Sequence, residues 1–327
     1  MKRRIIIILI ALTMVLCVAF LSGCQKKEEK YPNKSIELVI PYKAGGSSDI
    51  TARTFASYLE KELGTTITIT NIGGGGTVEG TIYAYNQPSD GYTIMSVTNS
   101  HLMKEAQNAL DFKFTEKFTP LCNMCKDVAM LAVKADSQFQ TFDDLVAYAK
   151  EHPGELTKSG VSAGAGDEFN NMQINKAMGI ELTFIPYEGT SEAKAAVLGN
   201  ECVILDDKVL SISSLVKSGD LRPLITNSAS RITTLDWLDG IPCFEEYGIL
   251  TSEIFRGIAI KSDVPEDVQK TLIEACNRVQ ENKEWQKWLE EQNLNILIPE
   301  KDVTKIKEQW VKEKDGYIEF YKELGTI

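Results

Sequence analysis

The chain has 327 residues and a formal net charge of −11, with 46 acidic side chains against 35 basic ones. This length exceeds that of one ordinary domain and suits two lobes. The acidic balance argues against a nucleic-acid partner, because such proteins present a basic face to phosphate groups. An anionic ligand would have to be held by local hydrogen-bond donors, since the overall field offers it no attraction.

The N-terminal residues have the pattern of a secretory signal. Lys2, Arg3 and Arg4 precede an apolar run over residues 5–21, and Leu-Ser-Gly-Cys ends at Cys24. A basic start, an apolar core and a small-residue cleavage site are typical of exported proteins. The Leu-Ser-Gly-Cys segment resembles a bacterial lipobox, whose cysteine is acylated and becomes the first mature residue. An uncleaved membrane anchor is the alternative, because the apolar run nearly spans a bilayer.

Residues 1–23 are therefore predicted to be a lipoprotein signal peptide, and residues 24–30 a flexible polar tether. From residue 31 onward no apolar run approaches the length of a second membrane span. We expect the mature chain to lie outside the cytoplasm, anchored to the cell membrane by a lipid on Cys24.

Beyond the tether, short β-branched runs alternate with amphipathic stretches, which is the pattern of parallel α/β units. The predicted strands are Ile36–Ile40 and residues 67–70, 93–97, 156–161, 181–185 and 202–205. The predicted helices are residues 49–63, 166–178, 190–198, 265–280 and 302–324, and one that Thr141 opens with a capping box and Pro153 closes.

Glycine loops follow several of these strands, at residues 44–48, 73–76 and 162–166. Glycine lets backbone N–H groups converge on a ligand, and the helix that follows adds unsatisfied donors and a partial positive charge. In open α/β sheets the binding crevice forms at the carboxyl ends of the strands. Two facing lobes would thus bring the three loops to one anion-binding cleft. The alternative is that they are only tight turns.

Three catalytic interpretations fail on the residues present. Residues 160–164 match a nucleophile elbow, but His101 and His152 both precede Ser162, whereas that fold places its histidine after the serine. The glycine run at residues 73–76 lacks the third glycine of a dinucleotide motif at the required spacing. No His, Cys and carboxylate side chains cluster with metal-ligand spacing. We therefore expect a binding protein, with no catalytic residue, no metal and no cofactor.

The cysteines beyond Cys24 are odd in number and have no framework spacing, so a disulfide scaffold is not indicated. Cys122 and Cys125 have the spacing of a redox or zinc motif, but a zinc site needs a second pair or nearby histidines. Two buried cysteines, or one incidental bridge, account for this pair.

Six segments, in order and in register, resemble the tripartite tricarboxylate transporter solute receptors, also called Bug proteins. The first is the opening, with Tyr-Pro-Asn-Lys-Ser-Ile at residues 31–36 and Ile-Pro-Tyr-Lys-Ala-Gly-Gly-Ser-Ser-Asp at residues 40–49. The other five are the Asn and Gly residues of 71–80, Pro-Ser-Asp-Gly-Tyr-Thr at 88–93, Ser-Ala-Gly-Ala-Gly at 162–166, Pro-Tyr-Glu-Gly at 186–189 and Gly-Asp-Leu-Arg-Pro-Leu at 219–224. The similarity spans about residues 31–325.

This resemblance implies a two-lobed α/β protein of the periplasmic-binding type (type II), in which each lobe is a mixed sheet flanked by helices and a hinge joins the lobes. Lobe 1 would contain residues 31–130 and 257–327, and lobe 2 residues 131–256. The implied function is an extracytoplasmic receptor that closes around a small carboxylate, such as a di- or tricarboxylate. The implied partners are the membrane permease subunits of a tripartite transporter.

The family holds a carboxylate between its first glycine loop and that of the second lobe, partly through ordered waters. Carried over by position, the implied ligand-binding residues are Tyr42, Ala44, Gly45, Gly46, Ser47, Ser48, Ser162, Ala163, Gly164, Ala165, Gly166, Gly189, Thr190 and Asp207.

Several residues depart from the family pattern. Tyr42 replaces a phenylalanine and adds a hydroxyl, and Lys43 offers a cation, although a solvated lysine is the commoner case. Asp167 and Glu168 follow the second glycine loop, where small polar residues are usual. They either match an amine on the ligand or only supply favourable charge to a first helical turn. An amino acid or other amphoteric ligand is therefore an alternative, as are a sensory ligand-binding protein and a surface enzyme acting on a carboxylate.

The lipid anchor can be tested on the chain itself. Cys24→Ser should move the protein out of the membrane fraction, because the thiol that would carry the acyl chains is gone. The measurement is fractionation of cells supplied with labelled fatty acid. If the wild-type protein never incorporates the label, the anchor hypothesis is wrong.

Overall fold

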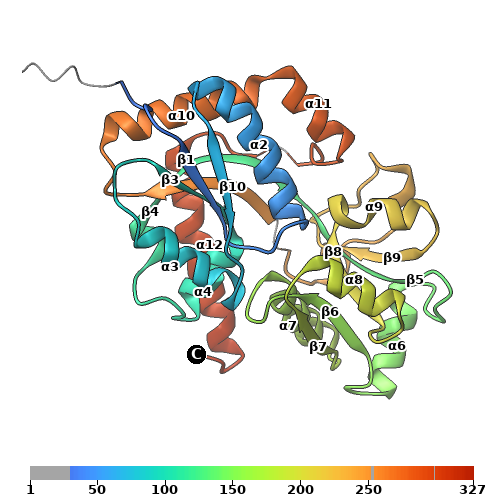
Figure 1. The fold of residues 1–327 in the computed structure, drawn as a ribbon. Coiled ribbons are helices and arrows are strands. Elements are labelled where there is room, and N and C mark those ends of the chain that lie inside the picture. Colours follow the sequence, from blue (N-terminus) through green and yellow to red (C-terminus); the bar gives the residue numbers. More distant parts are fainter. Residues whose placement is uncertain (1–29, 252–253, 298) are drawn as a thin grey trace, which may run out of the picture. The chain divides into compact units, whose positions relative to one another are not determined.

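The computed structural model describes residues 30–251, 254–297 and 299–327 (Figure 1). The predicted signal peptide, Cys24 and nearly all of the predicted tether lie outside these residues. Residues 34–327 form one compact unit, to which the description below refers. In the described parts of the chain, no helix is both long enough and apolar enough to cross a membrane.

The first sheet has five strands in the order β2-β1-β3-β10-β4. β1 (Ile36–Ile40), β2 (Ile67–Asn71) and β3 (Thr93–Thr98) run parallel to one another. β10 (Ile254–Lys261) lies antiparallel to both β3 and β4 (Phe118–Asp127). Because β10 comes late in the chain and pairs between β3 and β4, the chain leaves the sheet after β4 and returns to it.

Helices cover both faces of the first sheet. They are α2 (Ser47–Leu63), α3 (Val78–Tyr85), α4 (Asn99–Ala106), α5 (Phe114–Lys117), α10 (Glu266–Glu281), α11 (Lys283–Glu291) and α12 (Val303–Glu323). On one face α2 packs beside α10 (Figure 1). There the rings of Phe55 of α2 and Trp285 of α11 meet edge-on, with their centroids 5.2 Å apart. On the other face α4 packs beside α12, and Trp310 is buried in a cluster with Val97 and Phe255 of the sheet.

The second sheet also has five strands, in the order β7-β6-β8-β5-β9. They are β5 (Ala129–Lys134), β6 (Thr157–Val161), β7 (Thr183–Tyr187), β8 (Ile204–Lys208) and β9 (Leu221–Thr226). β6 pairs in parallel with β7 and β8, and β5 pairs antiparallel with β8 and β9. The helices on this sheet are α6 (Phe142–Glu151), α7 (Gly166–Met178), α8 (Thr190–Leu198) and α9 (Val209–Lys217).

The side chains of β5 explain why this sheet is covered on both faces. Leu131 and Val133 point into a core cluster with α6 and α7, whereas Met130 and Ala132 point into a cluster with α8 and α9. Successive strand residues face opposite sides of a sheet, so an uninterrupted apolar strand must be buried on both sides. The predicted α/β class, with two mixed sheets flanked by helices, is confirmed.

Local signals placed several helix ends correctly. α2 ends at Gly64, which adopts φ +64° as a left-handed cap. α6 has the predicted capping box, in which Thr141 Oγ1 accepts from the Asp144 N–H at 3.1 Å and Asp144 Oδ2 accepts from the Thr141 N–H at 2.9 Å. The strand predicted at residues 202–205 is shifted. It forms β8 and continues through Lys208, so that Asp206 and Asp207 lie within it.

Asp206 is tolerated in a central strand because Lys158 of β6 lies beside it. Lys158 Nζ is 2.6 Å from Asp206 Oδ2, and neither side chain is exposed to solvent. Lys158 Nζ also donates to the Asp167 carbonyl at 2.7 Å, and Asn170 Nδ2 donates to Asp206 Oδ2 at 3.2 Å. A buried charge is stable only when it is paired and hydrogen-bonded, and this pair meets both conditions.

Removing one partner of this pair should therefore be costly. We expect Lys158→Met to lower the free energy of unfolding by about 3–5 kcal/mol, because it leaves the Asp206 carboxylate buried without its cation. Lys158→Met combined with Asp206→Leu should recover most of the loss. Urea unfolding followed by circular dichroism is the measurement. Lys34→Met, which breaks an exposed pair with Asp90, serves as the control and should cost less than about 1 kcal/mol. Equal losses in Lys158→Met and the control would contradict the buried-pair argument.

Candidate functional site

Segments that follow strands of both sheets line a pocket of about 80 Å³. The lining from the side of the first sheet is Tyr42, Lys43, Gly46, Ser47, Ser48, Thr98, Asn99, Ser100, Ile254 and Arg256. The lining from the side of the second sheet is Val161, Ala165, Gly166, Asp167, Glu188, Gly189, Thr190 and Lys208. The volume is below the roughly 300–1,000 Å³ of drug-sized sites, so this space suits a small ligand.

Five helices, α2, α4, α7, α8 and α9, begin at this pocket, since the residue before each of them lines it. The residues that precede α2, α7 and α8 are Gly46, Ala165 and Gly189, and none of these three supplies a side-chain hydrogen bond to its helix. The first-turn N–H groups of a helix have no partner within the helix, and the helix dipole adds a partial positive charge there. α4 also begins here but is capped, since the Thr98 side chain accepts from the Ser100 N–H. α9, preceded by Lys208, has no side-chain cap either, but the N–H of its first residue, Val209, donates to the Val128 carbonyl. The starts of α2, α7 and α8 therefore supply backbone donors for an anion.

Hydroxyl groups lie between these helix starts. Tyr42 Oη is 2.7 Å from Thr98 Oγ1, and burial raises the pKa of Tyr42 despite its hydrogen bonds with Ser100 and Thr98. The hydroxyl that distinguishes Tyr42 from the phenylalanine of the family pattern thus belongs to the wall of the pocket. Thr98 and Ser100 were not predicted as site residues. Their signal in the sequence is a polar Thr-Asn-Ser segment directly after an apolar strand.

Arg256 is a cation of this wall that was not predicted from the sequence. Only 3% of its side chain is exposed. Its guanidinium donates to Asp127 Oδ2 at 2.7 Å and to Ser48 Oγ at 2.5 Å. Arg256 therefore links the start of α2 to the end of β4, where the chain leaves the first sheet. A charged residue inside the apolar run Ile-Phe-Arg-Gly-Ile was the available sign.

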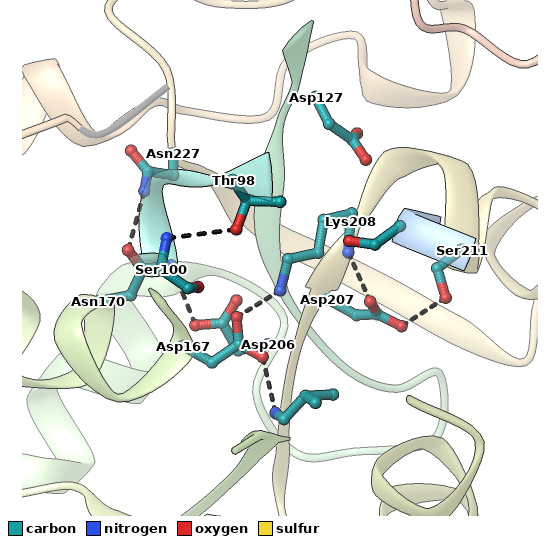
Figure 2. Close-up of polar contacts among 12 residues, drawn as sticks. Thr98, Ser100, Asp127, Asp167, Asn170, Asp206, Asp207, Lys208, Ser211 and Asn227 are labelled. Carbon is teal, nitrogen blue, oxygen red and sulfur yellow. Dashed lines mark hydrogen bonds and ion pairs between the residues drawn. The ribbon is translucent and has the colours of Figure 1, made fainter. Parts of the chain in front are cut away.

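Lys208 is a second cation of the pocket that was not predicted from the sequence. It precedes α9, lines the pocket, and donates from Nζ to Asp167 Oδ1 (Figure 2). Burial disfavours its charged form, but Asp167, Asp206 and Asp207 together raise its pKa above the ordinary value. The other oxygen of Asp167, Oδ2, accepts from the Val161 N–H at 2.7 Å. Asp167 thus has partners for both oxygens within the protein.

The neighbouring acid, Glu168, is outside the pocket lining. Its Oε2 accepts from the Gly164 N–H at 2.5 Å. Asp167 and Glu168 therefore hold the second glycine loop and the Lys208 side chain. This arrangement accounts for both acids without an amine on a ligand.

The structure divides the predicted ligand-binding residues into two groups. Those that line the pocket are Tyr42, Gly46, Ser47, Ser48, Ala165, Gly166, Gly189 and Thr190. Those outside the lining are Ala44, Gly45, Ser162, Ala163, Gly164 and Asp207. Gly45 donates its N–H to Asp49 Oδ2 at 3.0 Å, which closes the turn before α2. The first part of the second glycine loop, residues 162–164, is likewise bonded to the protein itself.

Asp207 lies behind the Lys208 wall of the pocket. It is 2% exposed, its Oδ1 accepts from the Lys208 N–H at 2.8 Å, and its Oδ2 accepts from Ser211 Oγ at 2.7 Å (Figure 2). Asp207 was expected to leave the sheet at its ligand-facing end. Because β8 continues through Lys208, its carboxylate instead binds the first turn of α9. Burial raises its pKa to about 6.

The buried cysteines form no part of this site. Cys122, Cys125, Cys202, Cys243 and Cys276 are free thiols, and all are buried. Burial raises the pKa of Cys125 to about 12, so its thiol stays protonated. Within the described ranges of the chain, no group of three His, Cys or carboxylate side chains is placed to hold a metal ion.

The chain is similar to proteins of one family. The profile of the tripartite tricarboxylate transporter family receptor matches residues 51–320. A Cupriavidus necator protein, described as the UPF0065 protein in the gbd 5' region, is 29% identical over 248 residues, which are 75% of each chain.

Solved structures with the same fold include two from Rhodopseudomonas palustris. One, described with adipate, has a TM-score of 0.82 and 20% identity, and the match covers 90% of this chain and 98% of that one. The other is MatC with bound malate, with a TM-score of 0.81 and 18% identity over 88% of this chain and 99% of that one. At these identities the likeness concerns the fold.

The raised pKa of Asp207 predicts a pH dependence of stability. The folded state favours the protonated carboxyl, so this contribution is fully present below the ordinary pKa of 3.8 and is lost as the pH rises through about 6. Relative to Asp207→Asn, which cannot ionise, the wild-type free energy of unfolding should fall by about 2 kcal/mol between pH 4 and pH 7. Urea unfolding at each pH is the measurement.

Asp144→Asn is the control for this experiment, with the opposite sign. Hydrogen bonds from Thr141 lower the pKa of Asp144. The wild-type protein should therefore gain stability relative to Asp144→Asn as the pH rises. A difference between wild type and Asp207→Asn that stays constant with pH would contradict the assignment of a raised Asp207 pKa.

Proposed function

Since the chain belongs to the tripartite tricarboxylate transporter receptor family, we propose that it is an extracytoplasmic receptor for a small carboxylate. Proteins of this family are solute receptors, and we infer that this chain binds its ligand without acting on it chemically. It would deliver the ligand to the membrane permease subunits of a tripartite transporter. The acyl group proposed on Cys24 would keep it at the membrane surface.

The observation that carries this proposal is the meeting of helix starts from both sheets at one pocket. α2 begins there from the first sheet, and α7 and α8 begin there from the second, all without side-chain caps. A carboxylate fits such a site because the first-turn N–H groups donate to it and the helix dipoles favour negative charge. An acidic protein can hold an anion in this way, with fixed local donors in place of an attractive overall field.

The charged side chains of the pocket lining are the cations Lys43, Lys208 and Arg256 and the carboxylates Asp167 and Glu188. Arg256 pairs with Asp127, Lys208 with Asp167, and Lys43 with Glu192 at 3.3 Å. Each cation thus has an acidic partner, and the backbone donors supply the remaining positive potential. The relatives described with adipate and malate hold dicarboxylates, which is consistent with a ligand of that class here.

We propose that the ligand is enclosed by movement of two lobes, one built on the first sheet and one on the second, which divide between β4 and β5 and again before β10. Gly46 of the first wall lies very close to the second: a Cβ placed on it would be 3.3 Å from Thr190 Oγ1. Glycine at this position lets the two walls approach one another around a small ligand. The chain passes between the sheets after β4 and again before β10, and these two crossings would form the hinge.

Within this proposal the ligand contacts come from the helix starts and the hydroxyl groups beside them. The contacting residues would be Tyr42, Gly46, Ser47, Ser48, Thr98, Ser100, Ala165, Gly166, Gly189 and Thr190. Arg256 and Lys208 would set the potential behind them.

Ligand-induced stabilisation tests the proposal. Malate, adipate and their neutral diamides are added to the mature domain, and thermal unfolding is followed. A dicarboxylate at a hundred times its Kd should add about 2.7 kcal/mol of stability. The diamides should add little, because they lose the charge-assisted bonds, worth about 1.5–3 kcal/mol each. Stabilisation by a diamide equal to that by its acid would contradict the anion site.

Gly46→Val locates the binding site. Its side chain would fill the gap to Thr190 and should weaken affinity at least about tenfold while the protein remains folded. Gly316→Val is the matched control, because nothing lies within 4 Å of a Cβ at Gly316 of α12. Calorimetric titration of both variants is the measurement, with circular dichroism to confirm folding. If folded Gly46→Val binds as tightly as wild type, this pocket is not the site.

A further inference from the structure

Two side chains beside the first sheet hold residues 162–164, the first part of the second glycine loop. Lys104 of α4 donates from Nζ to the Ala163 carbonyl at 2.9 Å. Gln107, the residue after α4, donates from Nε2 to the Gly164 carbonyl at 3.1 Å. The two side chains also bond each other, Lys104 Nζ to Gln107 Oε1 at 3.2 Å. We name Lys104 and Gln107 the α4 clamp.

The clamp connects elements that are far apart in the sequence. α4 follows β3 of the first sheet, whereas the loop follows β6 of the second. Gln107 Nε2 also donates to Tyr321 Oη of α12 at 2.8 Å, and Phe169 of α7 packs edge-on against Tyr321. The loop and the first turns of α7 thus rest on α4 and α12, which pack side by side (Figure 1).

Two glycines make room for the clamp. A Cβ on Gly164 would lie 2.2 Å from Lys104 Nζ, and one on Gly76 would lie 2.5 Å from Lys104 Cε and 2.8 Å from the Ala163 carbonyl oxygen. Both glycines have positive φ, +67° and +64°. Their sequence pattern indicates loops that open toward a ligand. In the structure their missing side chains leave space for a lysine.

Lys104 is an unusual residue to bury. It is 7% exposed, and its two hydrogen-bond acceptors, a carbonyl and an amide oxygen, are both uncharged. Burial lowers its pKa, and the Glu168 carboxylate partly offsets this. Burying an ammonium group is unfavourable unless its environment compensates it. Glu168 accepts from the Gly164 N–H while the clamp binds the carbonyls on either side of it, so the loop is held through consecutive peptide groups.

The residues that follow the clamped carbonyls belong to the pocket. Ala165 and Gly166 come next in the chain, line the pocket and start α7, whereas Lys104 and Gln107 do not line it. We propose that Lys104 and Gln107 are positioning residues, which hold the first turn of α7 at the pocket and so set ligand affinity without touching the ligand.

The physical reason is that the clamp bridges the two sheets. An arrangement in which the sheets move apart loses these hydrogen bonds, so their free energy favours the arrangement in which the walls of the pocket face each other. A ligand that needs both walls binds more tightly when that arrangement is populated. The expected effect on ligand affinity rests on the proposed function. The restraint of the loop by the α4 clamp can be measured without a ligand.

The test uses Lys104→Met and Gln107→Met, which remove the hydrogen bonds and leave an unbranched apolar side chain, one atom shorter than that of lysine and as long as that of glutamine. Lys176→Met is the matched control. It breaks an ion pair between Lys176 of α7 and Glu323 of α12, which joins the same two regions but is exposed. Amide hydrogen exchange of the unliganded protein over residues 162–170 should accelerate about tenfold or more in each clamp variant and stay unchanged in the control. Unchanged exchange in both clamp variants would overturn the proposal.

Calorimetric titration with malate and adipate gives the second readout. Any probe that binds the wild-type protein should bind each clamp variant at least about tenfold more weakly. The melting temperature of the unliganded variants should shift by no more than about 3 °C. A merely structural role would lower the melting temperature and leave the affinity of the folded protein intact, and that result would overturn the proposal. If neither probe binds the wild-type protein, the proposed ligand class fails, and the exchange experiment decides on the clamp by itself.

Discussion

The pocket depends on the backbone N–H groups at helix starts, which have no partner within their helices. Each helix leaves its first backbone donors without an internal partner, and α2, α7 and α8 bring theirs to one pocket without side-chain caps. Parallel strands followed by helices produce this meeting, since the carboxyl ends of the strands share an edge. Small residues at Gly46, Ala165 and Gly189 keep the donors accessible.

Paired charges connect the strands and helix that form the second-sheet side of the pocket. Lys158 lies between the Asp206 carboxylate and the Asp167 carbonyl, and Lys208 binds the Asp167 side chain. Asn170 joins the same group, and Asn227 Nδ2 donates to Asn170 Oδ1 at 3.0 Å (Figure 2). Hydrogen bonds and ion pairs of this kind restrict the arrangement of the elements that they connect. Here they fix the start of α7 relative to β6 and β8.

Local signals in the sequence predicted several helix ends and one of the loops that line the pocket. Thr190 and Leu198 bound α8 as expected, Gly64 ends α2, and the glycine loop at Gly46 lines the pocket. These depend on residues adjacent in the chain, so one sequence contains the whole signal. Asp206 shows the limit of such local signals. A carboxylate argues against a strand, and the cation that permits one at Asp206 is Lys158 of β6, 48 residues earlier in the chain.

Glycine shows the same division between local and distant information. Gly46 and Gly164 have the same sequence pattern, because each precedes a helix start in a small-residue loop. The chain alone does not show what occupies the space that a missing side chain leaves. At Gly46 that space faces Thr190 across the pocket, and at Gly164 it holds the Lys104 side chain. Arg256 and Lys208 were not predicted as pocket residues for a related reason, since strands far apart in the sequence bring them to one pocket.

The position of β10 has a consequence for the order of folding. β10 lies between β3 and β4, so the first sheet lacks the strand that joins β4 to the other three until residues 254–261 are available. The second sheet uses only the continuous segment from β5 to β9 and can form earlier. Contacts between distant segments form slowly, because a long loop must close first. If the chain is exported as proposed, its N-terminal strands would remain unpaired on one edge until most of the polypeptide had crossed the membrane, which keeps the chain open for passage.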